Sequence, residues 1–405
     1  MSETHSNDII RPSLFILVLM ISVGPFGDTE YIPSLTHIAR DFGVTYNESQ
    51  LTVTSYLFGF ALCQLFYGPF SDRFGRKPCM LFGACMFIVG STICYFSHNI
   101  NLLISGRFVQ AIGACAGTVL ANAAVRDSIP DEERGRTFAK MNAAFAIAPG
   151  IGPVVGGYVD EWFGWRANFA ILLLLSVILF VTVWFLLPET NHNKNPKATD
   201  PKRLVHNYFS LLKDPYFLPL LIIMGLCVGV VYSCLTESPG LVQLVLKVGS
   251  SYFALIAFGV MFGFIIGSLI CNYITRYLSQ NIIICIGLCI MLVSSLVMGW
   301  FVIIDYIHLS SMLIPIIIIF LGIAFVVPMA TAAALEPFAK NAGTASAMLG
   351  FTQMAIASLG TIVISFISNG TARAMPITFL LLTCIALLVF FVFIMGRPGR
   401  QRLSD

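Results

Sequence analysis

Three carboxylic acids and one arginine lie within long apolar segments, where a charged side chain is costly. Asp28 and Glu30 lie near the end of the first apolar segment, Glu237 lies in the seventh, and Arg107 lies in the fourth. Charged residues in such positions usually pair with each other or face a water-filled cavity. A carboxylate in a partly dry cavity can take up a proton on one side of a membrane and release it near an arginine. These residues therefore predict reversible protonation, with Glu30 as the first candidate carrier and Asp28 as the second.

Structural roles for these residues remain open. Each acid could be a capping or interface residue near the outer surface, and Arg107 could extend its charged end to the nearer interface. Glu30 is preferred because it adjoins Tyr31 and because a similar Thr-Glu pair beside a proline recurs at Glu237. All six histidines, His37 among them, fall in expected termini or loops, so they are not predicted to carry protons.

The composition predicts a protein that lies in a lipid bilayer. Of 405 residues, 57% are hydrophobic and 11% are charged, and the mean hydropathy is +0.86, unlike a typical soluble domain. A membrane-spanning helix needs about 20 mostly apolar residues. Twelve segments qualify, and they are continuous rather than alternating, which excludes a transmembrane β-barrel. The predicted spans are residues 12–35, 49–70, 78–97, 101–126, 135–160, 165–188, 217–240, 251–272, 281–303, 312–335, 343–369 and 374–397.

A polar segment divides these spans into two sets of six. It covers residues 189–214 and separates an N-terminal half, residues 1–188, from a C-terminal half, residues 215–405. With twelve spans, both termini lie on one side, and that side carries 18 of the 23 Lys and Arg residues. Because positive charge gathers in cytoplasmic loops, both termini are predicted to be cytoplasmic. The net charge of +3 reflects this topology and does not indicate nucleic-acid binding.

Three motifs place glycine or proline where helices turn or pack closely, and two of them also carry charge. The first is a basic turn between the second and third spans, where glycines allow close packing and a sharp bend. The second is Arg107-x-x-Gln110-x-x-Gly113 in the fourth span. The third is a run of glycine and proline in the fifth span, which membranes tolerate where another helix packs closely. The predicted gating and packing residues are Gly68, Asp72, Arg73, Gly75 and Arg76 in the turn, and Pro149, Gly152, Pro153, Gly156 and Gly157 in the fifth span.

The turn, with spacing G-x-x-x-D-R-x-G-R-K, resembles the loop between helices 2 and 3 of the major facilitator superfamily of transporters. The resemblance implies two parallel six-helix halves around a central cavity, and a latch formed by the turn's aspartate and arginine between the halves. Asp127 is the expected partner of Arg76. The fourth-span motif resembles that of proton-coupled transporters, where the arginine controls a carboxylate. The fifth-span ending, G-P-x-x-G-G, resembles the antiporter motif, which implies a tight contact with a helix of the second half.

Further motifs along the chain resemble the Bcr/CflA group of drug exporters. They are G-P-F-G-D-T-E-Y-I-P at residues 24–33, where the group has a pattern like G-P-x-x-T-D-M-Y-x-P, V-R-D ending at Asp127, G-W-R at residues 164–166 and A-G-T-A-S-A at residues 342–347. One departure stands out, because the group's aspartate aligns with Thr29, while acids flank it at Asp28 and Glu30. Each acid is turned about 100° from the expected face of a helix, in opposite directions. The two acids therefore cannot share one face of the helix unless Gly27 distorts the backbone.

The function predicted is proton-coupled export of small amphipathic compounds by alternating access, in a bacterial inner membrane. Tyr31, Gln110, Tyr232 and Gln353 are the candidate substrate-binding residues. Dedicated export of one metabolite, such as a siderophore, is an alternative, and proton-coupled uptake is a weaker one. No phosphate-binding loop, nucleophile motif or metal-ligand cluster is present, so we expect no enzyme activity, cofactor or metal. The expected partners are a small-molecule substrate, protons and the bilayer, with the protein acting as a monomer.

Overall fold

The computed structural model describes residues 11–247, 253–368 and 371–395, and these residues form helices and connecting loops without a strand. Twelve of the described helical segments are long and apolar enough to cross a membrane. The predicted class, an all-α membrane protein with twelve spans, is therefore confirmed. Of the basic residues used for orientation, those at 397–402 lie outside the described residues.

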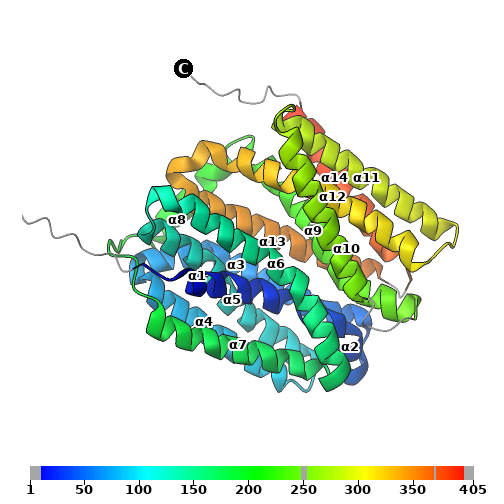
Figure 1. Cartoon of the computed structure of the whole chain (residues 1–405), viewed down its shortest axis with the longest axis horizontal. Coiled ribbons are helices and arrows are strands. Elements are labelled where there is room, and N and C mark those ends of the chain that lie inside the picture. The colour runs from blue at the N-terminus through cyan, green and yellow to red at the C-terminus, as the bar shows by residue number, and fades with distance from the viewer. Residues whose placement is uncertain (1–10, 248–252, 369–370, 396–405) are drawn as a thin grey trace, which may run out of the picture.

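The helices form two sets, which Figure 1 shows in blue to green and in green to red. The first set comprises α1 (Leu14–Thr29) with its continuations η1 (Ile32–Ser34) and α2 (Leu35–Phe42), then α3 (Tyr46–Phe74), α4 (Arg76–Tyr95), α5 (Ile100–Ser128), α6 (Asp131–Phe163) and α7 (Trp165–Leu186). The second comprises α9 (Phe217–Gly240) with η2 (Leu241–Val245), then α10 (Phe253–Ile274), α11 (Gln280–Ile303), α12 (Leu309–Leu335) with η4 (Glu336–Asn341), α13 (Ala342–Ile367), and α14 (Ala374–Phe390) with η5 (Phe391–Met395). Between the sets, α8 (Pro201–Leu212) forms a helix within the segment predicted as a polar linker.

Polar residues just before several spans satisfy the free backbone N–H groups at the helix starts. The side chain of Ser13 accepts from the N–H of Ile16 at the start of α1, and that of Asn99 accepts from the first turn of α5. Thr45 and Glu48 form a reciprocal capping box at the start of α3. These caps define where each apolar segment becomes helical.

Two predicted boundaries differ from the structure. The first span does not end near residue 35 but continues through η1 and α2 to Phe42, because Pro33 lies at the start of a helical turn, where a missing N–H costs little. Asp28 and Glu30 consequently lie near the middle of this span. The basic turn is also shorter than expected: α3 ends at Phe74 and α4 begins at Arg76, with Gly75 between them at φ 108°.

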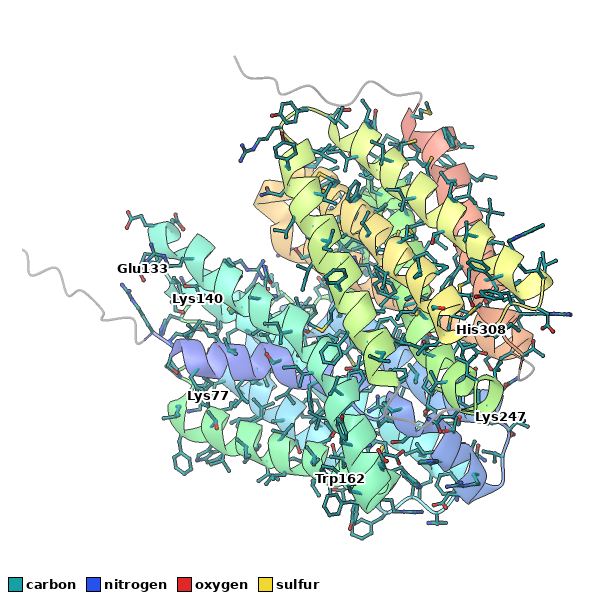
Figure 2. The ribbon with its side chains drawn as sticks, turned by 45° about the vertical axis from the view of Figure 1, so that its right-hand side comes forward. Lys77, Glu133, Lys140, Trp162, Lys247 and His308 are labelled. Atoms are coloured by element: carbon teal, nitrogen blue, oxygen red, sulfur yellow. The ribbon has the colours of Figure 1, made fainter. Side chains whose placement is uncertain are left out.

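The two sets meet mainly through α3 with α13 and α6 with α10. We call the side where α1 begins the terminal side, and the opposite side the far side. Among the described residues, the side-chain hydrogen bonds that join spans of the two sets involve mid-span or far-side residues. Toward the terminal side, Phe145 and Ile147 of α6 are exposed, and Figure 2 shows the Lys140 end of α6 standing apart from α10. The two sets are therefore joined at the far side. Toward the terminal side, α6 of the first set and α10 of the second set diverge.

Candidate functional site

Arg107 on α5 is the centre of a buried polar cluster in the first half. Its side chain is completely buried, and its guanidinium carbon lies 4.1 Å from the ring centres of both Tyr31 and Tyr56. The Nη1 atom donates to the carbonyl oxygen of Gly27 at 3.0 Å and to Oε1 of Gln110. Stacking on two aromatic rings stabilises a desolvated cation. Arg107 thus lies deep within the protein instead of extending to an interface.

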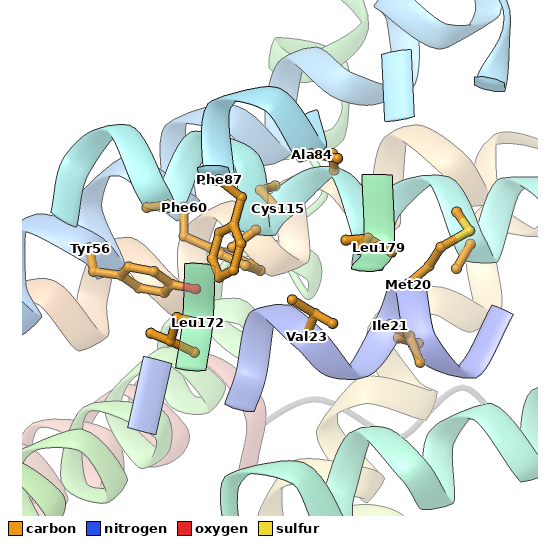
Figure 3. Close-up of a cluster of buried hydrophobic side chains, with 14 of the residues drawn as sticks. Met20, Ile21, Val23, Tyr56, Phe60, Ala84, Phe87, Cys115, Leu172 and Leu179 are labelled. Carbon is orange, nitrogen blue, oxygen red and sulfur yellow. The ribbon is translucent and has the colours of Figure 1, made fainter. Parts of the chain in front are cut away.

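Neighbouring helices hold the two rings in place. The hydroxyl of Tyr31 lies 2.9 Å from Oγ1 of Thr52, and the hydroxyl of Tyr56 donates to the carbonyl oxygen of Gly24 at 2.9 Å. Figure 3 shows Tyr56 beside Phe87 and Leu172 in the surrounding apolar cluster. One ring between α1 and η1 and one ring on α3 therefore position a cation carried by α5, and the sequence did not single out this sandwich.

Asp28 connects this cluster to the second half. Its carboxylate is almost completely buried, and its Oδ2 accepts a hydrogen bond from the hydroxyl of Tyr232 on α9. Its Oδ1 has no hydrogen-bond partner among the described residues. Asp28 is also close enough to Arg107 for an electrostatic interaction. A single side chain thus links the arginine of the first half to a tyrosine of the second.

Glu30 faces a different neighbour. Its side chain is completely buried, and neither carboxylate oxygen has a hydrogen-bond partner among the described residues. A Cβ atom placed on Gly156 of α6 would lie only 1.6 Å from the carbonyl oxygen of Glu30 and 3.2 Å from its Cγ. Glu30 therefore packs against α6 of its own half, whereas Asp28 faces α9. The two acids thus do not share one face of the first span.

The glycines of the fifth span have a different partner from the one predicted. Cβ atoms placed on Gly152 and Gly156 would meet Thr29 and Glu30 of α1, at 2.5 Å and 1.6 Å. The expected contact with a second-half helix occurs on the opposite face of α6, where Gly150, two residues before Gly152, faces the sulfur of Met261 on α10. The prediction of a close contact was right, but its main partner is α1. Pro149 and Pro153 lie within α6, which continues through both.

Glu237 lies at the far side in a network that joins the two halves. Its Oε2 accepts from Nε2 of Gln50 at 2.7 Å, and its Oε1 accepts from the hydroxyl of Ser368 at 2.9 Å. Nearby, the hydroxyl of Tyr46 donates to the carbonyl oxygen of Thr236 at 2.5 Å. These groups come from α3 in the first half and from α9 and the end of α13 in the second. Opening the far side would require these hydrogen bonds to break.

The charged turn at the terminal side forms a cluster within the first half. Nη1 of Arg76 lies 2.6 Å from Oδ1 of Asp72, and its Nε lies 2.8 Å from Oδ2 of Asp127, so the expected pair with Asp127 is present. Glu189 accepts from the N–H of Arg76 at 2.8 Å and would clash with a Cβ at Gly75. Arg73 instead donates to Thr199 of the segment after α7.

One other predicted feature of this region differs from the structure. A Cβ placed on Gly68 would meet nothing within 4 Å, so this glycine makes no close helix contact here. The polar linker contacts the first half, because the hydroxyl of Tyr208 on α8 donates to the carbonyl oxygen of Leu65 at 2.7 Å. Burial raises the pKa of Tyr208 to about 12, so the hydroxyl keeps the proton that it donates.

The candidate substrate-binding residues do not share one environment. Tyr31 and Gln110 are completely buried around Arg107. Tyr232 and Gln353 are partly exposed, on α9 and α13 of the second half.

Sequence reasoning also missed the contact of His37 with Asp160 at 2.6 Å. His37 lies in α2 within the first span, so the prediction that it lies in a loop was wrong. The sequence signal for this contact was Asp160, an acidic residue at the very end of the predicted fifth span.

Comparisons with known proteins identify the family. Residues 14–361 match the family model described as Major Facilitator Superfamily. Multidrug resistance protein D of Escherichia coli is 28% identical over 344 residues, covering 84% of this chain and 85% of that protein. A bicyclomycin resistance protein homologue of Haemophilus influenzae is 31% identical over 208 residues, about half of each chain. A bacterial homologue of the human lysosomal transporter Spinster, solved in an inward-facing and unoccupied conformation, covers 96% of this chain with a TM-score of 0.74 at 14% identity. The chain belongs to the major facilitator superfamily, and its resemblance to the Bcr/CflA-type drug transporters is confirmed.

Proposed function

We propose that this member of the major facilitator superfamily is a proton-coupled exporter of small amphipathic compounds. Asp28 is the residue at which proton and cargo compete, and the two halves alternate between states open to opposite sides. The observation that carries the proposal is the position of Asp28, buried near Arg107 and hydrogen-bonded by Tyr232 of the other half. The drug-resistance names of the relatives support the class of cargo.

The mechanism follows from the partners of Asp28. When Asp28 is ionised, it accepts from Tyr232 and offers a negative charge to a cationic or amphipathic cargo. When Asp28 binds a proton, its negative charge disappears, and so does its electrostatic attraction to Arg107. Cargo and proton are then exclusive occupants of one carboxylate, which is the requirement for exchange. Because Asp28 lies where the halves meet, its charge can bias their arrangement.

The arrangement of the halves supports a state open toward the terminal side. The far side is joined by the network around Glu237, while α6 diverges from α10 toward the terminal side. With both termini cytoplasmic, as the distribution of basic residues predicts, this state is inward-facing. In the opposite state, Asp72 and Arg76 would latch the terminal side against the second half. Their present contacts lie within the first half.

The proposal can be tested with purified protein in liposomes that contain a pH indicator. Adding ethidium as a cationic probe should move protons in the opposite direction, and an imposed pH gradient should drive its accumulation. Asp28→Asn keeps the size of the side chain and some hydrogen bonding but removes the titratable group. We expect this variant to bind the cation ethidium more weakly, because the negative charge is gone, and to lose accumulation driven by the gradient.

Asp305→Asn is the matched control, because Asp305 is exposed in the loop before α12. The control should exchange ethidium for protons at the wild-type rate. Wild-type coupling in Asp28→Asn would contradict the assigned role of Asp28. If Asp28→Asn keeps the coupling and Glu30→Gln loses it, the residue at which proton and cargo compete would be Glu30, the first candidate from the sequence.

A further inference from the structure

A second polar cluster lies within the first half near its far-side surface. Nδ1 of His37 on α2 lies 2.6 Å from Oδ2 of Asp160 on α6. The side chain of Asp160 is completely buried, whereas 31% of the His37 side chain is exposed. An imidazole that titrates near neutral pH therefore connects a buried carboxylate with solvent on the far side.

Polar groups continue from Asp160 toward the centre of the membrane. Gly156 lies one helical turn away, about 6 Å along α6. Its carbonyl oxygen accepts from Nδ2 of Asn168 at 3.2 Å, and the same nitrogen lies 3.0 Å from the hydroxyl of Ser34. Glu30 packs against the same turn of α6, since its Cγ would lie 3.2 Å from a Cβ on Gly156. These groups form a line from the far-side surface to Glu30.

Several buried oxygen atoms along this line have no hydrogen-bond partner among the described residues. They are both carboxylate oxygens of Glu30, Oδ1 of Asn168 and both carboxylate oxygens of Asp160, of which Oδ2 lies 2.6 Å from Nδ1 of His37. All three residues are buried, with Asp160 the most exposed at 4%. Burying an unpaired polar group costs free energy, and single water molecules commonly satisfy such groups. Buried acceptors without protein partners along this line could each be satisfied by a water molecule, and a chain of such waters conducts protons.

We propose that His37 and Asp160 form the far-side start of a proton path that ends at Glu30 and supplies Asp28. The proposal rests on the proton coupling proposed above. Solvent protonates the ring of His37, the Nδ1–H passes its proton to Oδ2 of Asp160, and the neutral ring remains. The proton then moves through water beside Asn168 to the carboxylate of Glu30. Only N–H and O–H bonds form and break, and each next proton from solvent restores the starting state.

This path lies entirely within the first half. Because His37, Asp160 and Glu30 all belong to that half, the path moves with it as the halves rock, and coupled exchange requires that it load Glu30 when the far side is open. Glu30 also lies near enough to Arg107 for an electrostatic interaction. The arginine can therefore favour release of the proton from Glu30 toward Asp28, on the other face of α1.

Other charged groups around His37 have partners of their own or lie in solvent. On α2, Arg40 is exposed, and Asp41 lies 3.1 Å from Arg166 of α7. Of the elements packed against α2, α3 carries Glu48, which accepts from Thr45, and α9 carries Glu237, which accepts from Gln50 and Ser368. Asp160 is thus the carboxylate that contacts His37 directly.

The test compares two readouts in liposomes that contain His37→Gln or Asp160→Asn. One is ethidium transport driven by a pH gradient, and the other is ethidium counterflow at equal pH, which needs no net proton movement. His98→Gln and Glu161→Gln are matched controls, because His98 and Glu161 are exposed near the same side. We expect driven transport to fall several-fold in both test variants, with counterflow and both controls unchanged. At a constant pH difference across the membrane, wild-type driven transport should also decline as far-side pH rises through the titration of His37, and this decline should be absent from His37→Gln.

An equal fall of driven transport and counterflow would overturn the path, because it would show that the pair merely ties α2 to α6. Unchanged driven transport in both variants, together with its loss in Asp28→Asn, would overturn the path and leave the proposed function standing. A cargo-free measurement covers the case in which ethidium is not transported. After a pH jump, the infrared band of protonated Glu30, assigned with Glu30→Gln, should appear more slowly in both test variants. An unchanged rate would refute the path independently of transport.

Discussion

Replacing one of two adjacent glycines in α6 should show how much depends on the contact between α1 and α6. A Cβ on Gly156 would lie 1.6 Å from the carbonyl oxygen and 2.6 Å from the carbonyl carbon of Glu30. A Cβ on Gly157 would meet nothing closer than Pro33, at 3.8 Å. Gly156→Ala and Gly157→Ala therefore add the same methyl group to the same helix. The first methyl group would overlap the backbone of Glu30, whereas the second would make an ordinary van der Waals contact with Pro33.

The expected difference can be worked from these distances. Cβ atoms essentially never come within 3.0 Å of another heavy atom, so α1 and α6 must separate locally by at least 1.4 Å, the difference between 3.0 and 1.6 Å. A backbone oxygen cannot rotate away as the end of a side chain can. Overpacking of this kind costs about 1–3 kcal/mol, and we expect about 3 kcal/mol here. The helix-propensity gain of alanine over glycine, up to about 1 kcal/mol, applies to both variants and cancels in the comparison.

The assay measures thermal stability and exchange for both variants. Detergent-purified protein is heated, and the fraction that remains monodisperse on size-exclusion chromatography gives an apparent Tm. Gly157→Ala should match or exceed the wild type in Tm and in ethidium–proton exchange. Gly156→Ala should lose several degrees in Tm and most of its exchange, because α1 also carries Asp28. Equal stability and exchange in the two variants would refute the claim that Gly156 holds α1 against α6.

Three further substitutions test other parts of the structure. Asp72→Asn should slow exchange while ethidium binding, measured by fluorescence, is retained; full exchange would remove the gating role. Gly152→Leu should block exchange, whereas Gly152→Ala should be milder because its nearest obstacle is the hydroxyl of Thr29 at 2.5 Å; equal tolerance would argue against a packing role. Tyr46→Phe removes the hydrogen bond to Thr236, so a cysteine at Thr54 should react faster with a membrane-impermeant maleimide from the far side; an unchanged rate would show that this bond does not hold the far side closed.

The spans could be predicted from the sequence because the length and apolar content of a segment report directly on burial in lipid. The close contact of the fifth-span glycines could be predicted for a similar reason, since small side chains let backbones approach. Their partner could not, because nothing in Gly152 or Gly156 specifies which helix fills the space. The sandwich around Arg107 was missed because Tyr31 and Tyr56 lie on different helices, and their register depends on packing. His37 was placed in a loop because the first span was ended too early, near Pro33.

The two acids of the first span illustrate how far such reasoning reaches. Their spacing predicts different faces of the helix, but the face that meets the second half depends on the rotation of α1 about its axis. In the structure that rotation turns Asp28 toward Tyr232 and Glu30 toward Gly156. A carboxylate enclosed between α1 and α6 is poorly placed to compete with a cargo but well placed to hold a proton on its way. A carboxylate between the halves can meet both. The geometry thus favours a division of labour, in which Glu30 conducts protons and Asp28 exchanges them for cargo.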